Sequence, residues 1–97
     1  MKPAIYHPAA EQELNEAALF YESRSSGLGA VFMSEVEESV RRIQEGPETF
    51  PVLRGKVRRK LVYNFPYGIL YREDATEIRI VAVMHLHRRP GYWQSRV

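Results

Sequence analysis

Cysteine is the most informative absence from this chain of 97 residues. Without a thiol, the chain has neither a disulfide framework nor thiolate chemistry. Long hydrophobic runs are also missing, because no segment approaches the roughly 20 apolar residues that a membrane helix needs. The chain does not open with a charged segment followed by an apolar one, so we expect no secretory signal. We therefore expect a cytoplasmic protein that has no membrane partner.

The composition is otherwise ordinary for a globular protein, with 44% hydrophobic and 27% charged residues. The length suits one compact domain, residues 1–97, and is too short for two. A domain of this size buries roughly 60–70% of the surface of its unfolded chain, which is enough for one real core.

Charge is distributed unevenly along the chain, although the formal net charge is only +2. Residues 1–50 carry nine glutamates against four lysines and arginines, a net charge of −5. Residues 51–97 carry ten lysines and arginines against three acidic residues, a net charge of +7. This asymmetry predicts that the second half builds an interaction surface for a polyanion or an acidic partner.

The first half of the sequence predicts a short strand and two helices. Residues 4–7 alternate in part, and Pro8 suits the first turn of a helix. A helical pattern runs from Ala9 to a break at residues 25–27, where Ser25 or Ser26 can cap a second helix. That helix is expected from Leu28 to Gln44, with a spine of Phe32, Val36, Val40 and Ile43. Because the two helices are close in sequence, they should form an antiparallel hairpin.

The second half predicts strands. We expect a loop at 46–56, a strand at 57–65, a turn at 66–68, and strands at 69–72 and 77–85. Short connections make neighbouring strands antiparallel. The expected fold is α+β, in the order β-α-α-β-β-β: an N-terminal strand, then an antiparallel helical hairpin packed on a small, mainly antiparallel sheet.

A group of five cations leads into the first of these later strands. Positive charges this close repel one another, so the group suits contact with phosphate or an acidic partner, although a solvated basic loop is an equal alternative for this segment alone. The C-terminal cations favour the contact, because the strands can bring both groups to one region. Alternation along a strand should put Arg58 and Lys60 on one face and Arg59 on the other. The candidate residues for binding a target or nucleic acid are Arg54, Lys56, Arg58, Arg59, Lys60, Arg72, His87 and Arg88.

The stretch from Ile78 to Trp93 changes from a buried strand to a group of cations and aromatic residues. Residues 80–84 have the composition of a central strand. Imidazole suits general acid–base work near neutral pH, and arginines can stabilise the phosphorane of RNA cleavage. The alternative is that one of His85 and His87 packs at the sheet edge and the other is solvated.

Other features of the chain point to structure rather than chemistry. His85 and His87 lack further ligands for zinc, so we expect no metal site and no cofactor. Trp93 is expected to anchor the C-terminus on the core. The remaining candidates for acid–base pairs are interpreted as solvated helix faces: Glu11, Glu13, Glu35, Glu37 and Glu38.

Several motifs follow one another in a specific order. They are His7-Pro8-Ala9 before Glu13-Leu14; Gly27-Leu28-Gly29 before Phe32 and Glu35-Val36-Glu37; Arg58-Arg59; Phe65-Pro66-Tyr67 with Ile69 and Tyr71-Arg72; and residues 80–83 with His85, Arg88-Arg89-Pro90 and Tyr92-Trp93. Together they resemble the RelE/ParE superfamily of toxins from type II toxin–antitoxin modules, often labelled plasmid stabilisation proteins.

The resemblance implies a helical hairpin on a sheet that the first strand joins, and a cognate antitoxin in a hetero-oligomer. RelE-like members cleave messenger RNA in the ribosome, whereas ParE-like members poison DNA gyrase. Gly68 stands where the ribonucleases carry a catalytic arginine, and Leu61 where many carry a lysine; Arg59 matches a basic position. Arg88 or Arg89 and Tyr92 match the C-terminal arginine and tyrosine, and His85 can stand in for a catalytic histidine.

The resemblance is closer to the ParE side. We therefore expect a growth-inhibiting toxin that acts on DNA gyrase. The alternative is an mRNA endonuclease, ribosome-dependent or free, with His85, Arg89 and Tyr92 at the scissile phosphate. A further alternative is a degenerate, non-toxic member of the family.

Overall fold

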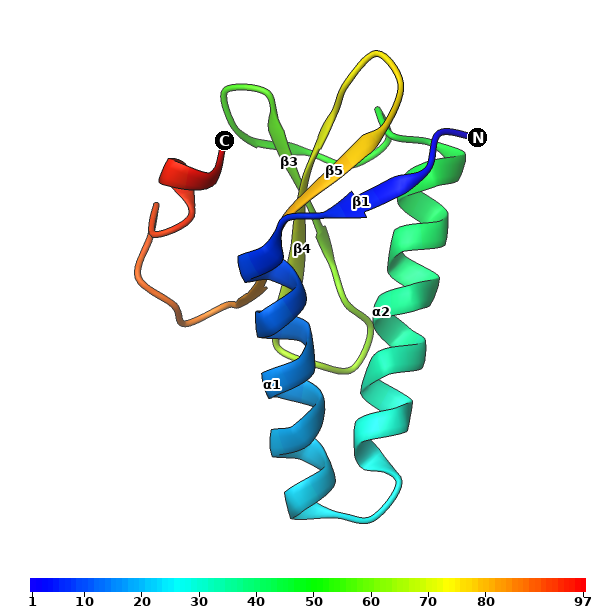
Figure 1. Ribbon diagram of the computed structural model, residues 1–97, viewed down its shortest axis with the longest axis vertical. Helices are drawn as coiled ribbons and strands as arrows, with labels where there is room; N and C mark the ends of the chain where they lie inside the picture. The colour runs from blue at the N-terminus through cyan, green and yellow to red at the C-terminus, as the bar shows by residue number, and fades with distance from the viewer.

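Two helices lie against one face of a five-stranded sheet in the computed structural model, which describes residues 1–97 (Figure 1). The elements follow in the order β1 (Ala4–Tyr6), α1 (Pro8–Arg24), α2 (Leu28–Glu45), β2 (Val52–Arg54), β3 (Val57–Leu61), β4 (Tyr67–Glu73), β5 (Ile78–His85) and a short 3-10 helix, η1 (Gln94–Arg96). The predicted α+β class and the hairpin-on-sheet arrangement are confirmed.

The sheet has the strand order β1-β5-β4-β3-β2. β1 runs parallel to β5, with Ala4 opposite Ile78 and Tyr6 opposite Ile80. The other neighbours are antiparallel. The first strand therefore joins the sheet beside the last one, as the family resemblance implied.

Three predicted assignments on the β side are wrong. Residues 52–54, inside the expected loop at 46–56, form the edge strand β2, which is too short and too exposed for alternation to reveal it. The strand expected at 57–65 ends at Leu61, and Asn64 turns the chain with a left-handed backbone (φ 64°). Tyr67 and Gly68, expected in a turn, instead begin β4, where Gly68 pairs with Leu61 and Met84.

The helices begin with unusual caps. The His7 ring accepts the backbone N–H of Ala9 at Nδ1 (3.0 Å), and Pro8 opens α1 as predicted. The expected serine cap of α2 is wrong. Gly27 is the capping residue, with φ 88°, and the Glu22 carboxylate accepts the N–H groups of Gly27 and Gly29 at 2.9 and 3.0 Å. A Cβ on Gly29 would lie 2.6 Å from the Ala18 carbonyl oxygen, so only glycine lets the two helices approach this closely.

A core lies on each face of the sheet. The inner face, toward the helices, carries the larger one, and the predicted spine of α2 is buried in it. The outer face carries a smaller core: Val57, Leu70, Val81, Ala82, Met84 and Trp93. The C-terminal segment, residues 86–97, returns beside this outer face (Figure 1, orange to red), and Trp93 is only 4% exposed. The prediction that Trp93 anchors the C-terminus is confirmed.

Neither helix combines the length and the apolar composition that crossing a membrane requires.

Candidate functional site

Three arginines from different segments surround a cavity of about 260 Å³ on the outer face of the sheet, which we call the arginine cavity. Arg54 ends β2, Arg59 lies in β3, and Arg88 follows β5. The rest of the lining is mostly apolar: Leu53, Met84, Leu86, Pro90, Gly91 and Trp93. The cavity therefore joins a cationic rim to an apolar floor built on the smaller core.

Gly68 makes room for one of these arginines. It is buried in β4, and a Cβ there would lie 3.0 Å from Cδ and 3.1 Å from Cγ of Arg59. The aliphatic stem of Arg59 thus lies across the glycine, and any side chain at position 68 would push the stem aside.

The other two guanidinium groups are also supported. Arg54 donates to the Gln94 side-chain carbonyl, 2.6 Å from Nη1 and 3.0 Å from Nε, when that amide is oriented to satisfy both groups. The guanidinium carbon of Arg88 lies 4.1 Å from the centre of the Tyr92 ring. Arg54 is held by a neutral amide, whereas Arg88 contacts the neutral Tyr92 ring and also lies 3.8 Å from the Glu13 carboxylate.

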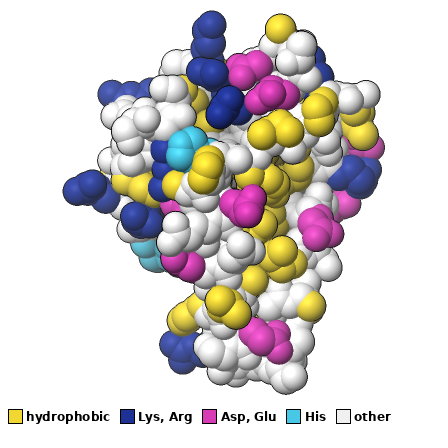
Figure 2. Space-filling view, viewed as in Figure 1, with side chains coloured by type: hydrophobic (Ala, Val, Ile, Leu, Met, Phe, Trp, Pro, Cys, Tyr) yellow, Lys and Arg dark blue, Asp and Glu magenta, His cyan; other side chains and the backbone are white.

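Six of the eleven other cations pair with carboxylates, whereas Arg24, Lys56, Arg58, Lys60 and Arg89 do not. The pairs are Lys2–Glu73, Arg41–Glu38, Arg41–Glu45, Arg42–Glu38, Arg72–Asp74, Arg79–Glu77 and Arg96–Glu13. Arg54 and Arg59 have no such partner, and Arg88 only approaches Glu13 at 3.8 Å. Figure 2 shows acidic side chains spread over the helical face, and Lys and Arg gathered mostly around its margins, with the largest group beside the C-terminal segment.

The predicted group of cations divides between the two faces, as alternation implied. Arg58 points to the inner face and donates to the Phe50 carbonyl at 2.8 Å. Lys60 lies over the Phe50 ring, with Nζ 5.3 Å from its centre. Burial lowers the pKa of Lys60, and the nearby Arg42 lowers it further. Of the remaining candidates, Arg72 is paired with Asp74, whereas Lys56, His87 and Arg89 are exposed.

His85 lies on the opposite side of the sheet from Arg54 and Arg59. Its ring packs edge-on against Tyr67, with centroids 5.1 Å apart, and lines a small cavity beside α1 together with Glu16 and Phe20. His85 Nδ1 accepts the N–H of His87 at 3.1 Å, so the proton of the neutral ring is on Nε2. No three His, Asp or Glu side chains lie together in a way that can hold a metal ion.

Tyr92 belongs to a cluster that we call the Glu13 clamp: Glu13, Tyr92 and Arg96. The Tyr92 hydroxyl donates to Glu13 Oε2 at 2.7 Å, and Arg96 Nη1 donates to Glu13 Oε1 at 2.8 Å. Burial raises the pKa of the Tyr92 hydroxyl, and the bond to the Glu13 carboxylate raises it further. Tyr92 therefore stays protonated and ties the C-terminal segment to α1.

The clamp also closes the free edge of β5. β1 ends at Tyr6, opposite Ile80, so beyond that point β5 has no strand neighbour on this edge, although β4 pairs with its other edge. The Glu13 carboxylate accepts the N–H of Val83 at 3.1 Å, and Arg96 donates to the Val81 carbonyl at 3.2 Å. Interpreting Glu13 as a solvated residue was wrong, because its side chain is only 13% exposed. The available signal was its place on α1 beside Ala10, Leu14 and Ala17, which are all buried.

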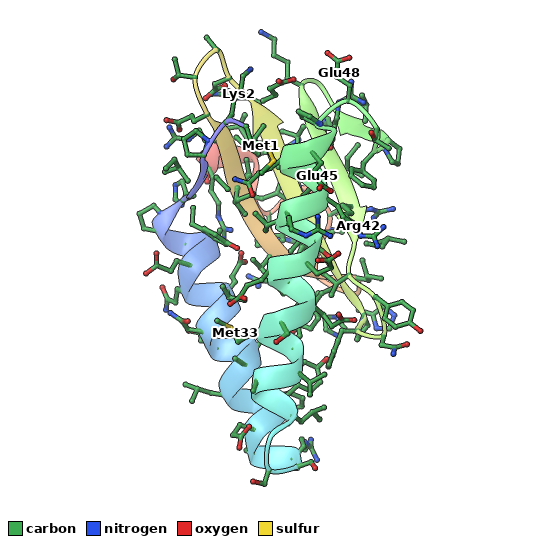
Figure 3. The ribbon with its side chains drawn as sticks, turned by 90° about the vertical axis from the view of Figure 1, so that its right-hand side faces the viewer. Met1, Lys2, Met33, Arg42, Glu45 and Glu48 are labelled. Atoms are coloured by element: carbon green, nitrogen blue, oxygen red, sulfur yellow. The ribbon has the colours of Figure 1, made fainter.

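A second surface feature is a groove between α2 and β3, which we call the α2–β3 groove. One part, of about 670 Å³, is lined by residues including Glu35, Arg42, Lys60, Leu61 and Tyr63. A neighbouring hollow shares Glu35 and Asn64 and is lined also by Val31, Phe65 and Pro66. Figure 3 shows Arg42 on the side of α2 that faces the strands. Val31, Leu61 and Tyr63 are 51%, 53% and 70% exposed, so apolar side chains project here into solvent.

Comparison with known proteins agrees with this fold. A family model described as the ParE toxin of the type II toxin–antitoxin system parDE matches residues 4–90. A chain from the solved structure of a chromosomal ParDE TA system from P. aeruginosa is 17% identical, with a TM-score of 0.76. The match covers 90% of this chain and 98% of that one, and at this identity the likeness concerns the fold. No curated protein sequence gives a significant match. Because the family model covers most of the chain, the protein belongs to the ParE toxin family of type II toxin–antitoxin systems.

Proposed function

We propose that this protein inhibits growth by binding DNA gyrase and stabilising gyrase's complex with cleaved DNA, and that a cognate antitoxin neutralises it. Membership of the ParE toxin family supports the role of toxin. The fold shared with a component of a ParDE TA system supports an antitoxin partner. The proposed action is binding and requires no chemistry from this chain.

The observation that carries the choice of binding over RNA cleavage is the separation of the candidate catalytic groups. RNA cleavage needs an acid–base group and cationic stabilisation at one phosphate. His85 lies on the inner side of the sheet beside α1, whereas Arg54 and Arg59 lie on the outer face. The Tyr92 hydroxyl is already bound to Glu13. A phosphate held between Arg54 and Arg59 would therefore lie on the opposite face of the sheet from His85.

The endonuclease remains the second candidate because of Arg88. This side chain lines the arginine cavity and also the small cavity that contains His85. An RNA strand bound at the rim between them can in principle meet an imidazole and a guanidinium together. The assignment of His85, Arg89 and Tyr92 as catalytic therefore stays a prediction.

The α2–β3 groove is the surface that we assign to the antitoxin. The charges of the groove differ along its length. Glu35 lines the hollow that contains Val31, and Arg42 and Lys60 line the larger part. From Val31 to Arg42 the helix rises about 16 Å, at 1.5 Å per residue. An amphipathic segment of about three helical turns matches this length. It should present apolar residues to Leu61 and Tyr63 and an acidic residue to Lys60.

Induced expression in bacterial cells tests the proposed target. Blocked replication with an SOS response is expected, and co-expression of the antitoxin from the adjacent reading frame should restore growth. Rapid translation arrest with cut transcripts would instead support the endonuclease. Normal growth with soluble, folded protein would identify a degenerate member of the family.

A further inference from the structure

We propose that the arginine cavity binds the phosphodiester backbone of a single nucleic-acid strand, and that it contacts DNA in the complex with gyrase. The first part stands on the geometry of the cavity alone. The second part rests on the proposed function.

Positive charge is concentrated at the arginine cavity, because its lining contains three arginines and no acidic residue. Of the eleven cations elsewhere in the chain, six have a carboxylate partner within 3.6 Å, and five have none: Arg24, Lys56, Arg58, Lys60 and Arg89. Arg54 and Arg59 have none, and Arg88 is 3.8 Å from a carboxylate that is already bound by Arg96 and Tyr92. Guanidinium groups that converge without a counterion fit an external anion.

Two of the three guanidinium groups are held in position before any ligand binds, and so is the stem of the third arginine. Arg54 is oriented by the Gln94 amide and Arg88 by the Tyr92 ring, and the aliphatic stem of Arg59 lies across Gly68. These supports reduce the side-chain entropy that binding an anion would otherwise cost. They also come from three separate segments, so the arrangement depends on the fold and not on a run of basic sequence.

The floor of the arginine cavity is apolar. Met84, Leu86 and Trp93 lie between the arginines and give an apolar surface. A nucleic-acid strand presents phosphates beside apolar sugar and base faces, so it matches a cationic rim over such a floor. An acidic peptide would supply charge but would leave much of this floor uncovered. A volume of about 260 Å³ is too small to admit a duplex, so we assign the cavity to a segment of one strand.

Fluorescence anisotropy with a labelled single-stranded DNA oligonucleotide tests the first part. Three phosphate contacts predict that the logarithm of the binding constant falls with the logarithm of salt concentration at a slope of about −2. Arg59→Gln should weaken binding roughly tenfold and reduce the steepness of that slope by about 0.7. Arg24→Gln is the matched control, because Arg24 is an exposed arginine at the far end of α1.

Gly68→Ala provides a second variant that keeps every charge. Its Cβ would displace the Arg59 stem, so binding should weaken several-fold although the slope in salt still reports three contacts. Equal losses in the Arg59 and Arg24 variants would show non-specific binding and overturn the proposal. Binding of an acidic peptide in the cavity, without binding of DNA, would also overturn the proposal. Circular dichroism of each variant confirms that it is folded.

The second part of the proposal, contact with DNA in the complex with gyrase, is tested separately. If Arg59→Gln lowers DNA binding and also lowers gyrase-dependent DNA cleavage, the cavity contacts DNA in that complex. If it lowers DNA binding but leaves gyrase-dependent cleavage at the wild-type level, the role in the complex is wrong while the binding site stands. If the wild-type protein has no effect on gyrase, the proposed function itself fails.

Discussion

Arg59 owes its position to a neighbour that has no side chain. In the ribonucleases of the superfamily the position of Gly68 carries a catalytic arginine, according to the resemblance in sequence. Here the stem of Arg59, from the adjacent strand, lies across that glycine. Positive charge therefore remains on the outer face, but it comes from β3 and lies on the far side of the sheet from His85.

His85 and Arg89 provide the residue-scale test of chemistry. His85→Ala and Arg89→Ala should each leave growth inhibition within about twofold of the wild type, because the proposed action is binding. The measurement is colony formation after induced expression, with protein levels matched by immunoblot. A loss of toxicity in either variant, with antitoxin binding intact, would support the endonuclease.

Tyr71 provides a residue-scale test of stability against pH. Its hydroxyl donates to the Pro47 carbonyl at 2.7 Å, and burial, helped by Glu73, raises its pKa to about 12. This pKa is above the value near 10 in the unfolded chain. The contribution of the protonated hydroxyl to the free energy of unfolding is therefore complete below pH 10 and is lost as the pH rises through 12. Two pKa units correspond to roughly 2–3 kcal/mol.

Tyr71→Phe should therefore cost about 1 kcal/mol at pH 8, through the lost hydrogen bond. Between pH 10 and 12 the free energy of unfolding of the Tyr71→Phe variant should fall less than that of the wild type. Urea denaturation at pH 8, 10 and 11.5 gives both free energies of unfolding. Parallel pH curves for the two proteins would contradict this account.

At the scale of elements, the Glu13 clamp joins α1, β5 and the C-terminal segment. Glu13→Ala removes the carboxylate partner of the partly buried Arg96 guanidinium, which keeps only the Val81 carbonyl, and leaves the Val83 N–H without its acceptor. The free energy of unfolding should fall by about 3 kcal/mol. Glu11→Ala, at an exposed position in the first turn of the same helix, should change it by less than about 1 kcal/mol. Chemical denaturation of both variants measures the two changes in the free energy of unfolding. Equal changes would show that the clamp contributes little to stability.

The α2–β3 groove makes a prediction at the same scale. Leu61→Glu should weaken binding of the purified antitoxin at least tenfold, because it puts a charge among the apolar residues of the groove. Leu19→Glu is the matched control, since Leu19 is an apolar residue 71% exposed on α1. Titration calorimetry measures both affinities. If the Leu19 variant is the weaker binder, the antitoxin occupies another surface.

The elements that sequence could predict are those with strong local patterns. The spine of α2 repeats at helical spacing, and Ile80–Met84 has the composition of a central strand. β2 escaped because three exposed residues carry no pattern. The clamp escaped for a different reason: Glu13 and Arg96 are far apart in sequence and meet only because α1 and the C-terminal segment both pack at β5. The arginine cavity likewise needed the register that places Gly68 under Arg59.

At the scale of the whole molecule, the two halves of the chain become two differently charged faces. The acidic first half supplies both helices, and the basic second half supplies β2 to β5 and the C-terminal segment. The arginine cavity lies on the outer face of the sheet, whereas the α2–β3 groove opens between a helix and the inner side. The molecule therefore offers separate surfaces for the proposed contact with DNA and for the proposed contact with the antitoxin.

The most direct test of the central claim is a DNA cleavage assay with purified gyrase, plasmid, ATP and the purified protein. If the protein acts by binding gyrase, linear plasmid should accumulate as the protein concentration rises, and no linear plasmid should form when the antitoxin is added first. The His85→Ala variant should produce linear plasmid as the wild type does. An unchanged pattern of plasmid species, together with cleavage of a messenger RNA by the same preparation, would contradict the central claim.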